Sequence, residues 1–308
     1  MSPKRPLHLV ALACSSLLPL AACGGSTGNA QIFITAESTI PQGIDGGEDP
    51  ENIRDGWSVR YDKFLVALGN FRAGRNSAPG DRRTDPRVLI LDLTKLPASG
   101  YVLTEFKDLA ATRWNQVGYD LPNATPSAVR TDTATQADYD LMVRNGWSLY
   151  VEGRLSNPSG QSCRPTAPAD CVAATEIRFR WGLRAGTAFD GCSPAQGEAG
   201  FAVPTGGTAQ VKPTIHGDHW FFNNLTNGVE ITDRYAQWIA NCDLDRDGET
   251  TTGELASVQP GLVFPSSRYS LSGSIIPIDS AFDYLEAQAR TIGDFQGDGE
   301  CPVRTVLP

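Results

Sequence analysis

Residues 176–184 read EIRFRWGLR, and this stretch decides the fold class. Its apolar residues Ile177, Phe179, Trp181 and Leu183 alternate with arginines and one glycine. Successive side chains of a β-strand point to opposite faces of a sheet. The period of two therefore predicts a strand with one buried face and one wet face.

Residues 146–155, GWSLYVEGRL, show the same alternation through Trp147, Leu149 and Val151. Similar segments, separated by Gly, Pro, Asn and Asp clusters, fill most of residues 31–212, and only residues 136–144 favour a short helix. This pattern is typical of antiparallel sheets packed face to face. We therefore predict a mainly β protein with an antiparallel β-sandwich domain over residues 31–212.

The period becomes helical in residues 213–308. Tyr235, Trp238, Ile239 and Cys242 recur at i, i+3, i+4 and i+7 after Asp233, which predicts a capped amphipathic helix. A second helix is expected over residues 280–291. The sandwich should thus be followed by a smaller helical region.

Residues 243–254, between these helices, read DLDRDGETTTGE. Asp243, Asp245 and Asp247 stand at positions one, three and five, Gly248 at position six and Glu254 at position twelve. This spacing resembles the EF-hand calcium loop, in which carboxylates converge on one hard cation and glycine permits the sharp turn. We therefore expect an EF-hand-like C-terminal region that binds calcium.

The resemblance also implies that Glu249 offers its backbone carbonyl, Thr251 a hydroxyl or a bridging water, and Glu254 both carboxylate oxygens. The loop departs from the family at position eight, where Thr250 replaces the aliphatic residue that pairs with a second hand. A single hand opens less readily than a paired sensor, so we expect a structural staple. The alternative interpretation is a solvated acidic turn without an ion.

The N-terminus reads as a targeting segment over residues 1–22, with two basic residues and then a short, interrupted apolar run. Its end, Leu20-Ala21-Ala22-Cys23, resembles the lipobox of bacterial lipoproteins, which implies a diacylglyceryl group on Cys23 and a membrane anchor. Residues 23–30 would form a flexible tether. Gly24 after the cysteine implies an outer-membrane lipoprotein, on its periplasmic or surface face. The alternative is an ordinary secretory peptide.

No other apolar run is long enough to cross a bilayer. The formal net charge of −9 makes nucleic acid a poor partner.

Beyond Cys14 in the targeting segment and Cys23 at the anchor, five cysteines remain, and an oxidising compartment favours disulfides between them. Cys163 and Cys171 flank a Pro-rich loop and form the first predicted pair. Cys242 and Cys301 form the second, which leaves the thiol of Cys192 over.

Two histidines lie in residues 213–222, PTIHGDHWFF. A turn at Gly217 could bring His216, Asp218 and His219 together as ligands for copper or zinc. The alternative is a structural pair satisfied by hydrogen bonds. The aromatic residues 220–222 are expected in the core.

Four segments, residues 117–123, 146–150, 180–183 and 191–192, resemble the MbnP-like periplasmic lipoproteins in order and spacing. That family has a β-sandwich fold and is associated with copper and with di-haem partner proteins. The resemblance implies a sandwich here. The family's full cysteine set and histidine-rich loop are not evident.

The motifs GxSxG, Walker A, GxGxxG after a strand, and CxxCH are all absent from the sequence. We therefore predict a non-enzymatic, membrane-anchored calcium-binding lipoprotein. A periplasmic copper or zinc carrier using His216 and His219 is the second hypothesis. A metal-dependent hydrolase is the third, and it lacks a third ligand that the sequence can identify.

Overall fold

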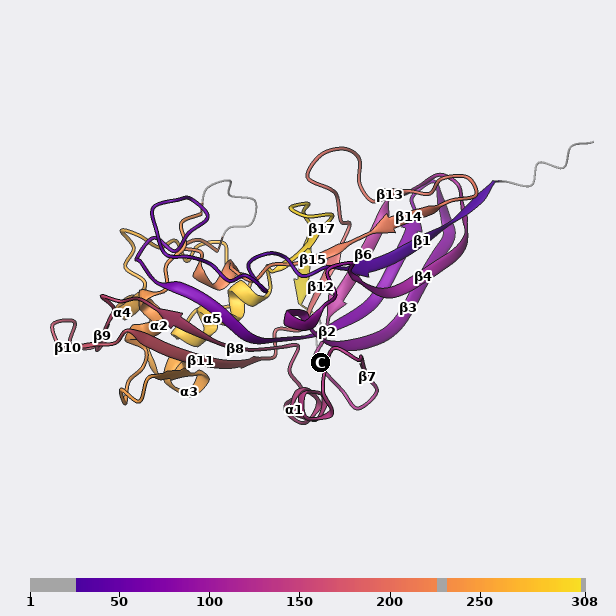
Figure 1. Cartoon of the computed structure of the whole chain (residues 1–308). Coiled ribbons are helices and arrows are strands. Elements are labelled where there is room, and N and C mark those ends of the chain that lie inside the picture. Colours follow the sequence, from indigo (N-terminus) through magenta and orange to yellow (C-terminus); the bar gives the residue numbers. More distant parts are fainter. Residues whose placement is uncertain (1–25, 226–231, 306–308) are drawn as a thin grey trace, which may run out of the picture.

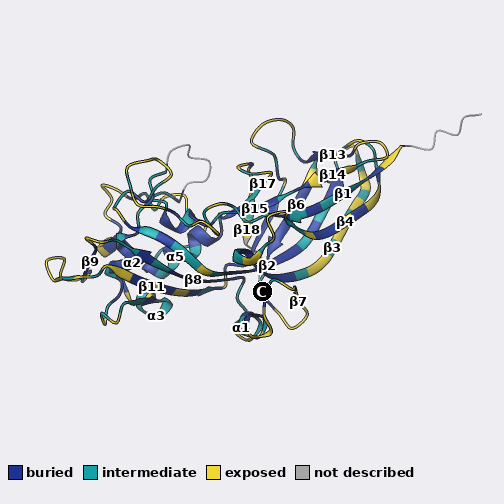
Figure 2. Ribbon diagram, viewed as in Figure 1, coloured by how far each residue is buried: buried dark blue, intermediate teal, exposed yellow. Residues whose placement is uncertain are grey.

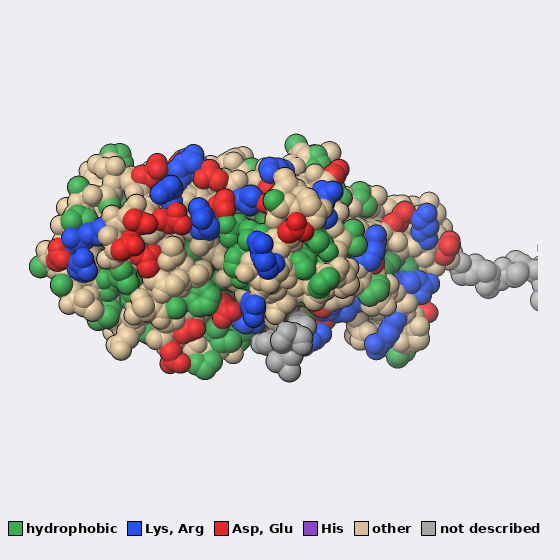
Figure 3. Space-filling view, turned by 90° about the horizontal axis from the view of Figure 1, so that it is seen from below, with side chains coloured by type: hydrophobic (Ala, Val, Ile, Leu, Met, Phe, Trp, Pro, Cys, Tyr) green, Lys and Arg blue, Asp and Glu red, His purple; other side chains and the backbone are tan. Residues whose placement is uncertain are grey.

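The computed structural model describes residues 26–225 and 232–305, and it shows an elongated, mainly β body (Figure 1). The predicted targeting segment 1–22 and Cys23 lie outside the described residues. Residues 27–30, which we assigned to the tether, instead form the start of strand β1 (Thr27–Ile34), so the predicted tether extends too far. Acidic and basic side chains are interspersed over the face of the body shown in Figure 3.

The largest sheet has nine strands and is built around β2 (Ser58–Arg75). The first half of β2 pairs with β8 (Leu149–Ser156), which is followed by β11 (Glu176–Leu183) and β16 (Glu249–Thr251). Its second half pairs with β3 (Ala78–Asp92) and β6 (Gln116–Leu121) at the other end of the molecule. From β6 the sheet continues through β12 (Thr187–Asp190) to β18 (Val303–Thr305), and β3 also pairs with β7 (Val129–Arg130).

A three-stranded sheet places β1 between β4 (Tyr101–Ala110) and β14 (Thr208–Val211). Figure 1 shows these strands curling beside β3 and β6. Three two-stranded pairs complete the β structure: β5 (Arg113–Trp114) with β13 (Phe201–Ala202), β9 (Gln161–Cys163) with β10 (Cys171–Ala173), and β15 (Pro213–Ile215) with β17 (Gly293–Phe295). The prediction of a mainly β protein is confirmed.

The alternation that predicted the strands is confirmed by burial (Figure 2). All four apolar residues of β11 are buried, whereas Arg178 and Arg180 are exposed. One expectation was wrong: the outer face of the large sheet is not wet throughout. Helix α1 (Gln136–Asn145) covers its centre, and Tyr150 packs there with Met142 in a second, smaller core.

Short helices connect the C-terminal strands: α2 (Gln237–Asn241), α3 (Thr252–Ser257), α4 (Pro260–Val263) and α5 (Ala281–Ala289). The second predicted helix is present as α5, and the side chain of Ser280 caps it. The predicted Asp233 cap of α2 is wrong, because Asp233 pairs with Arg54 at 3.1 Å. Asp55, far away in sequence, instead accepts hydrogen bonds from the backbone amides of Ala236 and Gln237 at the start of α2. Two 3-10 turns lie at Leu93–Lys95 and His219–Phe221.

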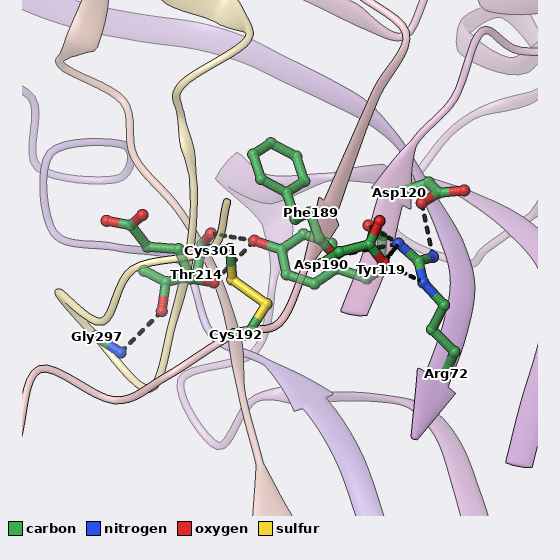
Figure 4. Close-up of a disulfide and its surroundings, with 10 residues drawn as sticks. Arg72, Tyr119, Asp120, Phe189, Asp190, Cys192, Thr214, Gly297 and Cys301 are labelled. Carbon is green, nitrogen blue, oxygen red and sulfur yellow. Dashed lines mark hydrogen bonds and ion pairs between the residues drawn. A yellow bond between two sulfur atoms is a disulfide. The ribbon is translucent and has the colours of Figure 1, made fainter. Parts of the chain in front are cut away.

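The disulfides are Cys163–Cys171, as predicted, and Cys192–Cys301, which corrects the predicted Cys242–Cys301 pair. Strand β12 pairs with β18, and the hydrogen bond from Ser193 N to Glu300 O extends this pairing, so Cys192 faces Cys301 (Figure 4). Cys242 ends α2 and points into the core with no exposed surface. It has no disulfide partner in the described part of the chain.

Candidate functional site

The acidic loop begins directly after α2 and ends in α3. One carboxylate oxygen from each of Asp243, Asp245 and Asp247 lies within 4.8 Å of the others. Gly248 adopts a left-handed φ of 82°, as the turn at position six requires. The three residues predicted from their spacing therefore do converge.

Backbone amides of the loop orient these carboxylates. Both oxygens of Asp243 accept hydrogen bonds, from Asp247 N and Gly248 N, each at 3.1 Å. Asp243 is buried, and burial raises the pKa of its carboxyl while the amides of the loop lower it. The carboxylates of Glu254 and Asp247 raise this pKa further, so the negative charges of the loop act on one another.

Glu254 folds back over the start of the loop. Its Oε1 accepts from Leu244 N at 2.9 Å, and its Oε2 accepts from Thr251 N at 2.8 Å. The Thr251 hydroxyl in turn accepts from Glu254 N, which makes a capping box for α3. The carboxylate at position twelve thus lies beside the residue after position one.

The segment at positions seven to nine is strand β16, which pairs with β11 and forms one edge of the large sheet. Thr250 lies opposite Phe179, is fully buried, and donates its hydroxyl to Ile239 O at 2.9 Å. Its carbonyl accepts from Trp181 Nε1 at 3.2 Å. Strand β11 therefore lies where a second hand would pair with the loop. The buried hydrogen bond of the Thr250 hydroxyl explains the polar residue at position eight.

Two other side chains tie the loop to its surroundings. Arg246 contacts Asp170 of the Cys163–Cys171 loop at 2.8 Å. The carboxylate of Glu249 lies 3.8 Å from Arg180 on β11. The side chain of Glu249 thus lies beside the sheet.

The histidine cluster lies near the middle of the body, where β15 ends. Pairing of β15 with β17 and the bond from His216 N to Ile292 O (2.9 Å) place His216 beside Asp294, whose Oδ2 is 3.1 Å from its Nε2. A single ligand atom from each of His216, Asp218 and His219 lies within 4.8 Å of the others. The turn at Gly217 brings the predicted trio together.

Asp218 is held by Arg234, whose Nη2 is 2.6 Å and Nε 2.9 Å from its Oδ2. His219 makes a 2.8 Å hydrogen bond between its Nδ1 and the Thr291 hydroxyl. The two imidazole rings stack with their centres 5.1 Å apart. Each member of the trio is therefore oriented by at least one neighbour.

The two histidines differ in charge when no metal is bound. Burial alone would lower the pKa of His216, but the carboxylates of Asp294, Asp218 and Glu37 raise it to about 9. Burial, and then the positive charge of His216, lower the pKa of His219 to about 3. His219 is thus the neutral imidazole of the pair.

Two of the three aromatic residues that follow belong to the core, as expected, whereas Phe222 is only half-buried. Trp220 and Phe221 have no exposed surface, and Trp220 stacks on Phe64 with ring centres 5.6 Å apart. Its indole donates to the Tyr61 hydroxyl at 2.7 Å. This packing anchors the backbone of the histidine turn.

Sequence reasoning missed Asp294, Thr291 and Arg234 as neighbours of the histidines. Asp294 and Thr291 lie more than seventy positions from His219, and the strands that bring them close have only three residues each, too few to show a period. Arg234 gave no signal, because a lone arginine has many surface roles.

Comparison with protein-family models, with curated proteins and with solved structures finds no match to this chain. The resemblances to lipoproteins, to the EF-hand loop and to MbnP-like proteins therefore rest on the motifs alone. Within residues 26–225 and 232–305, none of the helices combines the length and the apolar character needed to cross a bilayer.

Proposed function

We propose that this chain is an exported lipoprotein, anchored through Cys23, whose β-sandwich body is held together by a calcium ion in an EF-hand-like loop at residues 243–254. The observation that carries the calcium proposal is the convergence of Asp243, Asp245 and Asp247 within 4.8 Å at EF-hand spacing. The anchor rests on the lipobox motif.

The chemistry of the loop suits a hard dication. The twelve-residue loop has no lysine and carries five carboxylates, four of which stand at ligand positions, those of the three aspartates and of Glu254. Its one arginine turns away to Asp170. Calcium prefers six to eight oxygen ligands at about 2.3–2.6 Å. Glu254 would close on the ion through both oxygens, and Glu249 and Thr251 would complete the shell.

The position of the loop favours a structural role over signalling. Strand β16 adds to the edge of the nine-stranded sheet, α2 enters the loop from the core, and Arg246 connects the loop to the Cys163–Cys171 hairpin. An ion at this point would join three elements that are far apart in sequence. Opening of the two helices, as in a sensor, would break the pairing of β16 with β11.

A calcium titration of thermal stability tests the proposal. An extracellular EF-hand module binds at about 0.1–1 mM. At about 10 mM calcium, mass action then stabilises the folded protein by about 1.4–2.7 kcal/mol. For a protein of this size the melting temperature should rise by about 3–10 °C. Magnesium should do much less, because it dehydrates reluctantly.

Two variants and one control sharpen the test. Asn at position 245 keeps an acceptor for Asp247 N, so Asp245→Asn should fold normally and lose most of the calcium-dependent gain. Glu254→Gln should do the same through loss of a bidentate ligand. Asp62→Asn removes an equal charge from an exposed surface pair with Arg154 and should respond like the wild type. A wild-type melting temperature that is indifferent to both chelator and calcium would show that the loop is only an acidic turn.

A further inference from the structure

A second candidate for metal binding lies away from the calcium loop, at the histidine cluster. His216, Asp218 and His219 sit on the turn between β15 and the 3-10 helix that begins at His219, where the core aromatics fix the backbone. Their ligand atoms already lie within 4.8 Å of one another. Two ligands at about 2.1 Å from a tetrahedral zinc ion are about 3.4 Å apart, so each ligand atom needs to move inward by about 1 Å or less.

One polar atom of this cluster, Oδ1 of Asp218, is buried without a hydrogen-bond partner among the described residues. The side chain of Asp218 is only 5% exposed, and Arg234 occupies its other oxygen. Nε2 of His216 lies 3.1 Å from Oδ2 of Asp294, so a metal ion bound there would replace the proton of this ion pair. An unsatisfied buried polar atom costs about 1–3 kcal/mol. A cation coordinated by Oδ1 of Asp218 would remove that cost.

The hydrogen bonds of Thr291 determine the tautomer of His219. The Thr291 hydroxyl donates its single proton to Gln288 O at 2.8 Å, so its oxygen accepts from Nδ1–H of His219. The neutral ring then carries its lone pair on Nε2, which is the form that a metal ligand needs. Histidine ligands in proteins are commonly fixed in this way through the other ring nitrogen.

We infer that His216, Asp218 and His219 bind a divalent transition-metal ion of the zinc type, with Thr291 as a positioning residue and Asp294 placed to supply a fourth, oxygen ligand. Two imidazoles with carboxylates suit zinc and its neighbours, whereas calcium prefers oxygen alone. Such an ion would join the turn at Gly217 to the segment that leads from α5 into β17. This site is independent of the calcium loop.

Cobalt(II) and zinc(II) are suitable probes for the purified full chain, with about 10 mM calcium present so that the acidic loop is saturated. We expect one equivalent of cobalt to give a visible absorption band that one equivalent of zinc abolishes. Elemental analysis after dialysis should find one zinc per chain. The double variant His216→Gln/His219→Gln should lose both signals.

Thr291 provides the discriminating variants. Thr291→Val removes the acceptor for His219 and should weaken zinc binding by about 10–100-fold. Thr291→Ser keeps the hydroxyl and should restore the affinity, which a merely structural role for the methyl group would not do. Circular dichroism of each variant checks the fold. Substoichiometric zinc in the wild type, or equal zinc in the double histidine variant, would overturn the proposed metal site. A buried water would then be the partner of Oδ1 of Asp218.

Discussion

The long-range disulfide gives the sharpest test of the chain topology. Cys192 and Cys301 close a loop with a sequence separation of 109, whereas Cys163 and Cys171 are separated by only 8. In the chain-entropy model, a disulfide that closes about 100 residues contributes about 4.7 kcal/mol, and one that closes fewer than about 15 residues contributes less than about 3 kcal/mol. Total domain stabilities are about 5–15 kcal/mol, so the first loss is a large fraction.

We therefore expect the double variant Cys192→Ala/Cys301→Ala to lose about 2 kcal/mol more unfolding free energy than Cys163→Ala/Cys171→Ala. Urea unfolding followed by tryptophan fluorescence measures both losses. Cys192 and Cys301 are fully buried, so truncation of their side chains adds to the effect in the same direction.

The single variants control for this contribution. Cys192→Ala and Cys301→Ala each break the same bond, so each should cost nearly as much as the double variant. Single losses that simply add up to the double loss would refute the pairing, as would a peptide map that links Cys242 to Cys301. In the native protein Cys242 should resist alkylation, because burial raises the pKa of its thiol and blocks access.

Two further predictions concern the large sheet. Asp138 completes the capping box of α1 with Thr135 and pairs with Lys63. Burial raises the pKa of its carboxyl, but Lys63 and Thr135 lower it more, so the net pKa lies below the normal value. Asp138→Asn should thus lower the free energy of unfolding at neutral pH. In urea titrations the difference from the wild type should vanish as the pH falls below the unfolded pKa of about 4, because the wild-type carboxyl is then protonated and loses its stabilising contribution. Gly182→Ala would place a methyl group 2.0 Å from Trp147, so it should lower the free energy of unfolding by about 1–3 kcal/mol and perturb tryptophan emission. Gly191 has a left-handed φ but open space around it, so Gly191→Ala should leave that emission unchanged.

The sequence predicted those parts of the molecule that local periodicity determines. Strands β8 and β11 and helix α1 have enough residues for a period to be visible, and the acidic loop carries its ligands within twelve positions. The cap of α2 could not be predicted, because Asp55 reaches it from a distant loop. The second disulfide was mispredicted because it depends on the pairing of β12 with β18, two short strands whose register only the assembled sheet determines.

Strand β2 has a consequence for how the protein unfolds. Its eighteen residues pair with β8 at one end of the body and with β3 and β6 at the other, so both ends depend on one continuous segment. Neither end can lose its sheet without exposing the strand that supports the other. The protein should therefore melt as a single cooperative unit, and a protease that cuts within β2 should release both ends from the native state together.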